Sequence, residues 1–296
     1  METQVATAKS KHIIAPQKPV DTRKASLKAM YIIWYRDIIR YFRDRTRLIA
    51  SLAQPILFLI VFGTGLGSSL RAIGGFAGTA GSFQYTQYIY PGIIGMAALF
   101  TSMFSAMSIV WDREFGFLKE VLIAPVDRWA IVVGKTLGGA TQALIQGLIL
   151  LVLAPLVGVH LDLMSVLKLI PLLFFLSFSL TALGVAIASR LTTMQGFQAI
   201  MNFLIMPLFF LSGALFPLYG LPGWMNALTH IDPAAYGIDP IRKVLLTGPG
   251  YPPALVNKLG VSFGNWAVPI PVEVVILLAF GLIMLAAGIQ FLRRSE

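Results

Sequence analysis

The sequence contains no cysteine, only three histidines and few charged side chains, and each scarcity excludes a class of site or fold. Without cysteine, the 296 residues form neither a disulfide nor a thiolate-bound metal site. Charged residues make up 12% of the chain, whereas soluble domains have about 25%. Hydrophobic residues reach 57%, more than a soluble fold of this length can bury. The bilayer is therefore the expected solvent for most of the chain.

The scarcity of ionisable residues also disfavours two kinds of membrane protein. A membrane-embedded enzyme, such as a lipid or prenyl transferase, needs clustered carboxylates, metal ligands or a nucleophile beside a base. His12, His160 and His230 form no such group. An ion-coupled transporter normally carries ionisable residues near mid-membrane. Glu273, the one carboxylate close to a predicted span, is expected near its outer edge. These two classes remain alternatives, and we expect no catalytic residue and no metal site.

Six apolar stretches are long enough to cross a membrane, since about 30 Å of hydrocarbon requires roughly 20 helical residues at about 1.5 Å each. The third is long for one span, so we expect it to tilt or to begin at the interface. The predicted fold is an all-α polytopic membrane protein whose six-span domain covers residues 48–296. The predicted spans are Leu48–Leu66, Tyr88–Val110, Ala130–Val157, Lys168–Ser189, Phe197–Pro217 and Pro269–Phe291.

Basic residues predict the orientation. Lys and Arg gather before the first span, after the second and fourth spans, and in the C-terminal tail. The positive-inside rule then places both termini in the cytoplasm, and we expect the plasma membrane, the inner membrane of a prokaryotic cell. This placement accounts for the net charge of +10, so no nucleic-acid partner is expected. Residues 1–25 are predicted to be a disordered cytoplasmic tail without a cleaved signal peptide.

Residues 26–47 predict an amphipathic helix that lies in the membrane interface. It either anchors the first span to anionic lipid headgroups or also packs against a cytoplasmic partner. Apolar and aromatic side chains recur at helical spacing, and arginines occupy the opposite face. The first set is Leu27, Tyr31, Trp34, Ile38 and Tyr41, and the second is Arg36, Arg40, Arg43 and Arg47.

A charged segment between the second and third spans predicts a second amphipathic helix, over about 112–123. Its apolar stripe is Trp111, Phe115, Leu118 and Leu122, with Arg113, Glu114, Lys119 and Glu120 off that stripe. Pro125 should end the helix. Periodicity alone does not distinguish a helix that docks a partner from one that only lies on the membrane surface.

The stretch VVGKTLGG, residues 132–139, imitates a phosphate-binding loop. That loop requires G-x-x-x-x-G-K-[ST] between a strand and a helix. Trp129 stands where the first glycine should be, and the stretch begins a membrane span. We therefore expect no ATP or other cofactor on this chain, and we expect Lys135 to extend its amine toward the interface.

Residues 220–244 predict a re-entrant hairpin of short helices after the fifth span. Pro222, Pro233 and Pro240 suit first-turn positions, the last two preceded by the cap-forming Asp232 and Asp239. Tyr219, Trp224 and Tyr236 suit a membrane interface. The hairpin is either a structural cap or a lid over an exit.

Polar, aromatic and methionine side chains inside the spans have two readings, as packing between helices or as the lining of a substrate path. The amide and hydroxyl group consists of Gln54, Thr141, Gln142, Gln146 and Asn202. The aromatic and methionine group consists of Phe100, Met103, Phe104, Met107, Met201, Phe203, Met206 and Phe210.

Several motifs, in order along residues 27–294, resemble the type-2 ABC exporter permeases. The charged segment REFGFLKEVLIAPVDRW resembles that family's R-E-x-G-x-L-E-x-L-x-x-A/T-P-V loop. The stretch DIIRYFRDRTRLIASLAQPILFLIVFGTGLG resembles the family's entry into the first span, and YIYPGIIG resembles its start of the second span. The hairpin resembles the pattern F-P-x-x-x-L-P-x-W followed by N-P-x-x-Y-x-x-D-x-x-R. Here Asp232 replaces the Asn, and the remaining positions are Pro233, Tyr236, Asp239 and Arg242.

The resemblance implies a permease without catalytic residues that works as two copies, with two copies of a separate ABC ATPase docked below. ATP and Mg²⁺ would bind to that ATPase. The segment from Glu114 to Leu122 would be the coupling helix, beside the N-terminal helix and among membrane lipids. The drug and lipo-oligosaccharide exporters are the most similar branch, which implies an amphiphilic, drug-like or lipid-like cargo.

Overall fold

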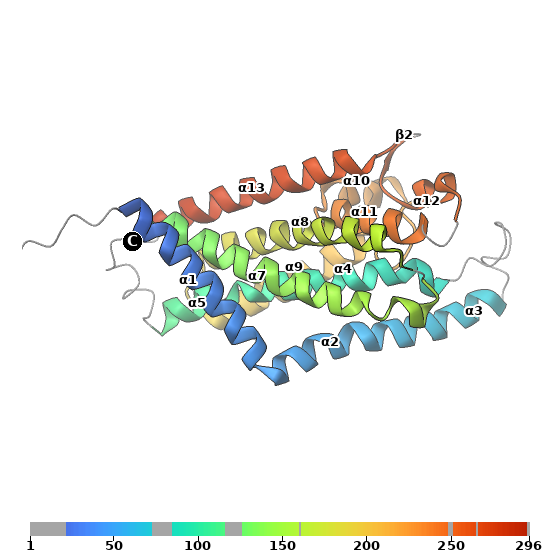
Figure 1. Ribbon diagram of the computed structural model, residues 1–296. Helices are drawn as coiled ribbons and strands as arrows, with labels where there is room; N and C mark the ends of the chain where they lie inside the picture. The colour runs from blue at the N-terminus through green and yellow to red at the C-terminus, as the bar shows by residue number, and fades with distance from the viewer. Residues whose placement is uncertain are drawn as a thin grey trace, which may run out of the picture.

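The computed structural model describes residues 22–72, 85–115, 126–159, 161–247, 251–264 and 266–294, and long helices make up most of it (Figure 1). The beginning of α1, the end of α5 and the end of α13 lie at one end of the elongated bundle, here called the termini end. Helices α10 and α12 lie at the opposite end, here called the hairpin end. The predicted all-α class is confirmed, with one short antiparallel pair of strands, Ser262–Phe263 (β1) and Trp266–Ala267 (β2).

The described helices follow one another along the chain. They are α1 Thr22–Arg43, α2 Arg45–Ile60, the π-helical η1 Val61–Leu66, α3 Gly67–Ala72, α4 Tyr85–Ser105, α5 Met107–Glu114, α7 Arg128–Leu151, η2 Ala154–Val157, α8 Leu163–Ala188, α9 Met194–Leu211, α10 Gly223–Ile231, α11 Ala235–Thr247, α12 Pro253–Leu259 and α13 Ile270–Arg294.

Among the described residues, five helical segments are long and apolar enough to cross a membrane. They are Leu48–Ser69, Tyr85–Glu114, Leu163–Ala188, Met194–Leu211 and Ile270–Arg294. The third predicted span corresponds to α7, whose Lys, Thr, Gln and Gly residues lower its hydropathy. Most of α7 is nevertheless buried, against α1, α4 and α8. The count of six spans stays a prediction.

The predicted interfacial helix is divided in two. Its first part, α1, begins at Thr22, four residues before the predicted start, and Asp44 separates it from α2. The carbonyl of Asp44 accepts from Leu48 N at 3.1 Å, so Asp44 opens the second helix. The residues 22–25, predicted to be disordered, are helical, whereas residues 1–21 lie outside the described part of the chain.

Helix α1 packs against α7 through a face that periodicity did not identify. Two glycines on α7, four residues apart, allow the close approach that small residues provide between membrane helices. A Cβ added at Gly134 would lie 2.9 Å from the carbonyl oxygen of Met30, and one at Gly138 would lie 3.2 Å from Asp37 Cβ. Of the predicted apolar face, Tyr41 is buried, whereas Leu27 and Tyr31 stay more than half exposed.

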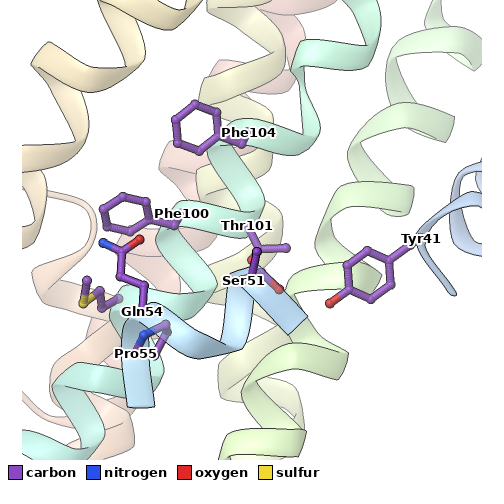
Figure 2. A pocket seen from close by; sticks show the side chains of 9 residues that line it. Tyr41, Ser51, Gln54, Pro55, Phe100, Thr101 and Phe104 are labelled. Atoms are coloured by element: carbon purple, nitrogen blue, oxygen red, sulfur yellow. The ribbon is translucent and has the colours of Figure 1, made fainter. Parts of the chain in front are cut away.

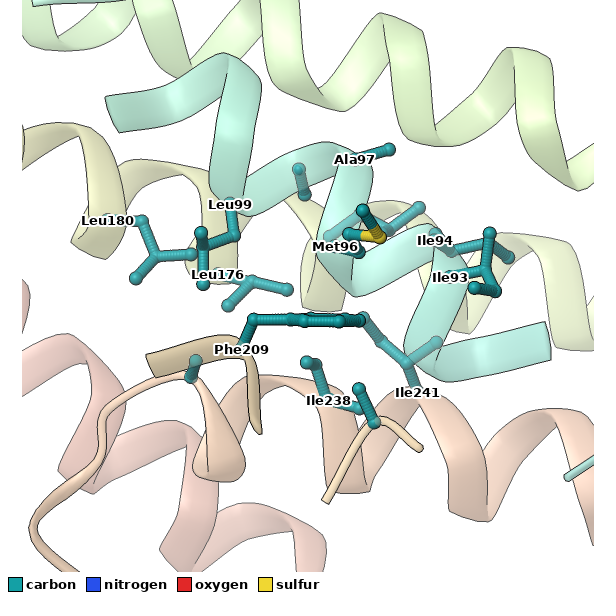
Figure 3. Packing of buried hydrophobic residues seen from close by; sticks show 14 of the residues in the cluster. Ile93, Ile94, Met96, Ala97, Leu99, Leu176, Leu180, Phe209, Ile238 and Ile241 are labelled. Carbon is teal, nitrogen blue, oxygen red and sulfur yellow. The ribbon is translucent and has the colours of Figure 1, made fainter. Parts of the chain in front are cut away.

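The core is centred on α4, most of whose residues are buried. Figure 3 shows the ring of Phe209, from α9, with Ile238 of α11 on one side and Leu176 of α8 and Met96 of α4 on the other. Backbone contact tightens this region, because a Cβ added at Gly92 would lie 2.2 Å from the carbonyl oxygen of Ala214. These contacts fix α4 as the helix around which α7, α8, α9 and α11 pack.

Candidate functional site

The end of α5 is clamped to the connection between α8 and α9. Arg113 Nη1 donates to the carbonyl of Leu191 at 2.9 Å, and Nη2 donates to that of Ser189 at 3.0 Å. These are carbonyls left over at the end of α8, which a cation satisfies well. Glu114 Oε2 accepts from Met194 N at 2.9 Å, at the beginning of α9. Both predicted docking residues therefore make contacts within the chain.

The predicted coupling helix does not begin as a separate element. Asp112, Arg113 and Glu114 form the last turn of α5, which continues the second span. Phe115 follows it with 64% of its surface exposed. The predicted docking residues Leu118, Lys119, Glu120 and Leu122 lie outside the described residues.

A buried ammonium joins α1, α5 and α7 beside this clamp. Lys135 Nζ lies 3.0 Å from Asp112 Oδ2 and 3.5 Å from Asp37 Oδ2, and it donates to Ser108 Oγ at 3.0 Å. Arg36 completes the cluster, 3.6 Å from each of the same two carboxylates. Lys135 is 4% exposed, so the expectation that its amine reaches the interface was wrong: the two carboxylates hold it inside.

The far side of the segment between α5 and α7 is held as well. Ser26 Oγ donates to Asp127 Oδ2 and accepts from Asp127 N, both at 3.0 Å. Arg128 donates to the carbonyls of Leu292 and Arg293, each at 3.0 Å. The chain that leaves α5 at Phe115 and returns at Val126 therefore starts and ends on fixed points.

Helix α9 divides its residues between a buried and an exposed face. Phe197, Met201, Ile205 and Phe209 form the buried stripe. The predicted path residues on this helix, other than Met201, are exposed instead: Asn202, Phe203 at 80%, Met206 at 52% and Phe210 at 47%. Gln195 and Gln198 share that face with Asn202, at spacings of three and four residues. An exposed row of amides is unusual for a helix that faces lipid.

The predicted path residues on the second span lie at different depths. Met103 is fully buried and therefore belongs to the packing of the core. Phe100, Phe104 and Met107 are partly exposed and lie against the core.

The predicted role of amides and hydroxyls as contacts between helices is confirmed at three positions. Thr141 Oγ1 accepts from Trp34 Nε1 at 3.1 Å. Gln142 Nε2 donates to the Asp37 carbonyl at 3.1 Å, and Gln146 Nε2 to that of Ser51 at 2.7 Å.

The hairpin end contains a second buried ionic cluster. Lys243 Nζ lies 2.8 Å from both Asp239 Oδ2 and Glu273 Oε1, while Arg242 Nη1 lies 3.8 Å from Asp239 Oδ1. Asp239 also accepts from Val261 N at 2.9 Å. The predicted helix start at Asp239 and Pro240 was wrong, because both lie inside α11. Glu273 lies in the first turn of α13, near the edge of the span as predicted, and its side chain is buried.

Of the predicted hairpin, only the first helix has an exposed face. Trp224 on α10 is 68% exposed, whereas Tyr236 on α11 is buried and donates its hydroxyl to the His230 carbonyl. Tyr236 is therefore enclosed by the protein, unlike Trp224. Asp232 Oδ1 accepts from Ala234 N at 2.8 Å, the bond expected of a residue that caps the following helix, with Pro233 between them. Burial raises the pKa of the Asp232 carboxyl well above its usual range.

Within the described part of the chain, no group of three or more His, Asp or Glu side chains is placed to hold a metal ion. The two ionic clusters pair carboxylates with ammonium and guanidinium groups instead. Their role is to join helices at the two ends of the bundle.

Comparison with known proteins gives this architecture its family. Residues 28–246 match the ABC-2 type transporters. The chain belongs to this family. It is similar to a putative transport permease, ycf38, of Cyanophora paradoxa, with 29% identity over 73% of each chain. A probable doxorubicin resistance ABC transporter permease, DrrC of Mycobacterium tuberculosis, is 29% identical over 74% of this chain and 78% of its own. Nodulation protein J of Rhizobium meliloti is 26% identical over 73% and 81%.

Membership of this family makes the chain a permease subunit of an ABC transporter and not itself an enzyme. It is a multi-pass membrane protein that works with an ABC ATPase subunit. The resemblance inferred from the sequence motifs is thereby confirmed.

Proposed function

We propose that two copies of this ABC-2 permease form the membrane half of an ATP-driven exporter, with two ABC ATPase subunits docked on the segment between α5 and α7. ATP and Mg²⁺ bind to the ATPase, and the permease moves an amphiphilic cargo out of the cytoplasm or the inner leaflet. The plasma membrane of a prokaryotic cell is the proposed location, with the termini end in the cytoplasm, where the positive-inside rule favours the basic residues of α1.

The observation that carries this proposal is the anchoring of the segment between Phe115 and Val126. A segment that transmits movement needs fixed ends, since a loose loop would absorb the displacement of its partner. Arg113 and Glu114 fix one end to α8 and α9. Asp127 and Arg128 fix the other end to α1 and α13. A push on the segment therefore reaches helices across the whole bundle.

The exposed amide row on α9 supports a second copy. Gln195, Gln198 and Asn202 are exposed in a single chain, and amides that face hydrocarbon without partners are costly. A facing copy or a water-containing path between copies would satisfy them. Phe203 and Phe210 on the same face would then lie at the boundary between the two chains.

The proposed cargo class rests on the names of the relatives and on the exposed face of α9. One relative carries a drug-resistance name and another a nodulation name. A path that combines amides with Phe203, Met206 and Phe210 suits a molecule with polar and apolar parts, because thioether and aromatic surfaces adapt to varied shapes.

The experiment is site-specific photo-cross-linking of the permease with its ABC ATPase in membranes. A photoreactive phenylalanine analogue replaces Phe115, and the control replaces Trp266, which is 54% exposed at the hairpin end. We expect a permease–ATPase cross-link from position 115 and none from position 266. Equal cross-linking at both positions, or cross-linking at 266 alone, would overturn the docking assignment.

A further inference from the structure

Two cavities lie beside the junction of α1 and α2, and they share Tyr41 and Phe104 as lining residues. The first has a volume of about 250 Å³ and lies between α2 and α4 (Figure 2). The second, of about 400 Å³, extends between α1, α5 and α7. The two cavities therefore adjoin each other, and Asp37, which lines the second, also belongs to the ionic cluster of Lys135.

The first cavity suits an apolar group. Its walls include Pro55, Met96 and the stacked rings of Phe100 and Phe104, whose centroids lie 6.4 Å apart. Thr101, a buried polar residue of its lining, donates its hydroxyl hydrogen to the side chain of Gln146. An apolar cavity of about 150 Å³ is enough for a benzene ring. The first cavity therefore has room for an aromatic group or a stretch of alkyl chain.

The second cavity suits a polar head that donates hydrogen bonds. Gln142 Nε2 donates to the carbonyl of Asp37, which fixes the orientation of the amide. Gln142 Oε1 is then left buried without a hydrogen-bond partner. A buried acceptor of this kind is costly unless something donates to it. Gln142 lines the cavity, so a turn of its amide toward the cavity would let a hydroxyl or ammonium group of a ligand donate to this oxygen.

The charges around the second cavity balance. Asp37 is paired with Lys135 and Arg36, and the guanidinium of Arg40 lies 5.6 Å from the centroid of the Trp111 ring. Asp44 is the other charged residue of the lining. Because neither sign dominates, the cavity favours a neutral or zwitterionic head over a strongly charged one.

Both cavities reach the surface on the side of the α1–α2 junction. Ala50 on α2 is exposed at the first cavity, and Arg40 and Asp44 on α1 are exposed at the second. A molecule in the adjoining leaflet could therefore enter with its head at α1 and its apolar part between α2 and α4. The lining residues of both cavities come from one chain.

We propose that each copy of this chain has its own amphiphile-binding site here, with a neutral or zwitterionic, hydrogen-bond-donating head in the second cavity and an apolar group in the first. The inference rests on the proposed export function and specifies the chemistry of the cargo. It also places the first binding step within one protomer, before the molecule reaches the path between copies.

The test uses the full chain in phosphatidylcholine nanodiscs that contain a small fraction of phosphatidylethanolamine with a photoreactive acyl chain. Mass spectrometry then maps the labelled residues. We expect labelling on the peptide that contains Phe100 and Phe104. Ala50→Trp, which fills the first cavity from its exposed side, should abolish it. The control Leu57→Trp changes a 60% exposed residue of the same helix outside the cavity and should leave labelling unchanged.

The head is tested by Gln142→Leu and by competition. Gln142→Leu should weaken phosphatidylethanolamine binding by roughly threefold to tenfold, the equivalent of one hydrogen bond. An unlabelled competitor with an ammonium donor should displace the probe better than phosphatidylcholine, which has none in its head. Equal labelling of Ala50→Trp and Leu57→Trp, or equal competition by the two lipids, would overturn the proposal.

Two further measurements separate this site from the export function. With ATPase and ATP added, transfer of the probe to the opposite leaflet identifies it as cargo, whereas labelling that persists without transfer identifies a resident bilayer lipid. Both outcomes support the site, and the second counts against the proposed cargo alone. Conversely, a cross-link from position 115 to the ATPase together with no cavity labelling would overturn the site and leave the exporter assignment standing.

Discussion

Lys135 Nζ lies 3.0 Å from Asp112 Oδ2, with only 3% of the lysine side chain exposed, and this pair joins the first turns of α7 to the last turn of α5. The segment proposed to receive the ATPase runs from one of these helices to the other. Asp37 binds the same ammonium from α1. One cation therefore holds together the N-terminal helix and both sides of the proposed docking segment.

Removing this cation should destabilise the protein strongly. Lys135→Met leaves the two carboxylates with only the half-exposed Arg36 as a shared partner. Removing the buried partner in this way costs about 3 kcal/mol or more. Thermal unfolding in detergent measures the loss, and Lys168→Met, at an exposed lysine, is the control. Adding Asp37→Asn and Asp112→Asn to Lys135→Met should recover much of it. A Lys135→Met protein as stable as the Lys168→Met control would contradict the role assigned to the cluster.

The contact between Glu114 and α9 changes how a mutation there should be understood. Glu114→Ala removes the acceptor of Met194 N at the beginning of α9, and losing such a helix cap costs about 1 kcal/mol of stability. The variant should reduce recovery of the ATPase in a pull-down at fixed salt. Glu114→Gln keeps an acceptor oxygen and should restore recovery if Glu114 acts by positioning α5. A direct charge contact with the ATPase predicts the opposite, with Gln as weak as Ala. Combining Glu114→Ala with Glu120→Ala should weaken recovery further.

Cysteine cross-linking tests whether two copies meet at α9. The chain has no native cysteine, so only the introduced thiols can form a disulfide. Asn202→Cys and Phe203→Cys place thiols on the exposed face of α9 and should form disulfide-linked dimers in membranes. Val275→Cys is the control, because Val275 is 65% exposed on α13 and lies on a helix without the amide row. Dimers that form only from position 275 would place the interface elsewhere.

The sequence predicted the long helices well because the bilayer imposes a length and an apolar composition on each of them. It could not predict the partners of Lys135, since Asp37 and Asp112 are distant in sequence and meet only when α1 packs on α7. A carboxylate at position 37, among arginines and apolar side chains, was the available signal. Gly138 of α7 lies directly against Asp37. The glycines Gly134 and Gly138 were therefore the corresponding signal on the partner helix.

The hairpin end shows why local motifs misled. Asp232-Pro233 and Asp239-Pro240 are the same dipeptide, and both predicted a helix start. Only Asp232-Pro233 begins a helix, because α11 continues through Pro240. The carboxylate of Asp239 instead pairs with Lys243 and accepts from Val261 N. Proline lacks an N–H group, but α11 is packed on three sides by α4, α8 and α13. Tertiary packing therefore outweighs the local preference.

These two aspartates give the last prediction, since the same substitution should have opposite outcomes. Asp239→Asn leaves Lys243 and Arg242 buried with less negative charge to pair with, and breaking buried pairs costs about 3–5 kcal/mol. Asp232→Asn keeps the oxygen that accepts from Ala234 N and removes an ionisable group whose charged form burial disfavours. It should match or exceed the wild type in stability at neutral pH.

The pH dependence of Asp232 sharpens the comparison. A raised carboxyl pKa means that the folded state binds a proton that the unfolded state has released, so wild-type stability falls as pH rises from the ordinary carboxyl range toward the folded pKa. Asp232→Asn lacks this term, and its advantage over the wild type should grow over that interval. Thermal unfolding from acidic to neutral pH measures it, with Asp232→Ala as the variant that also loses the cap. If Asp232→Asn and Asp239→Asn lose stability equally at every pH, the distinction between a cap and a buried ion pair is wrong.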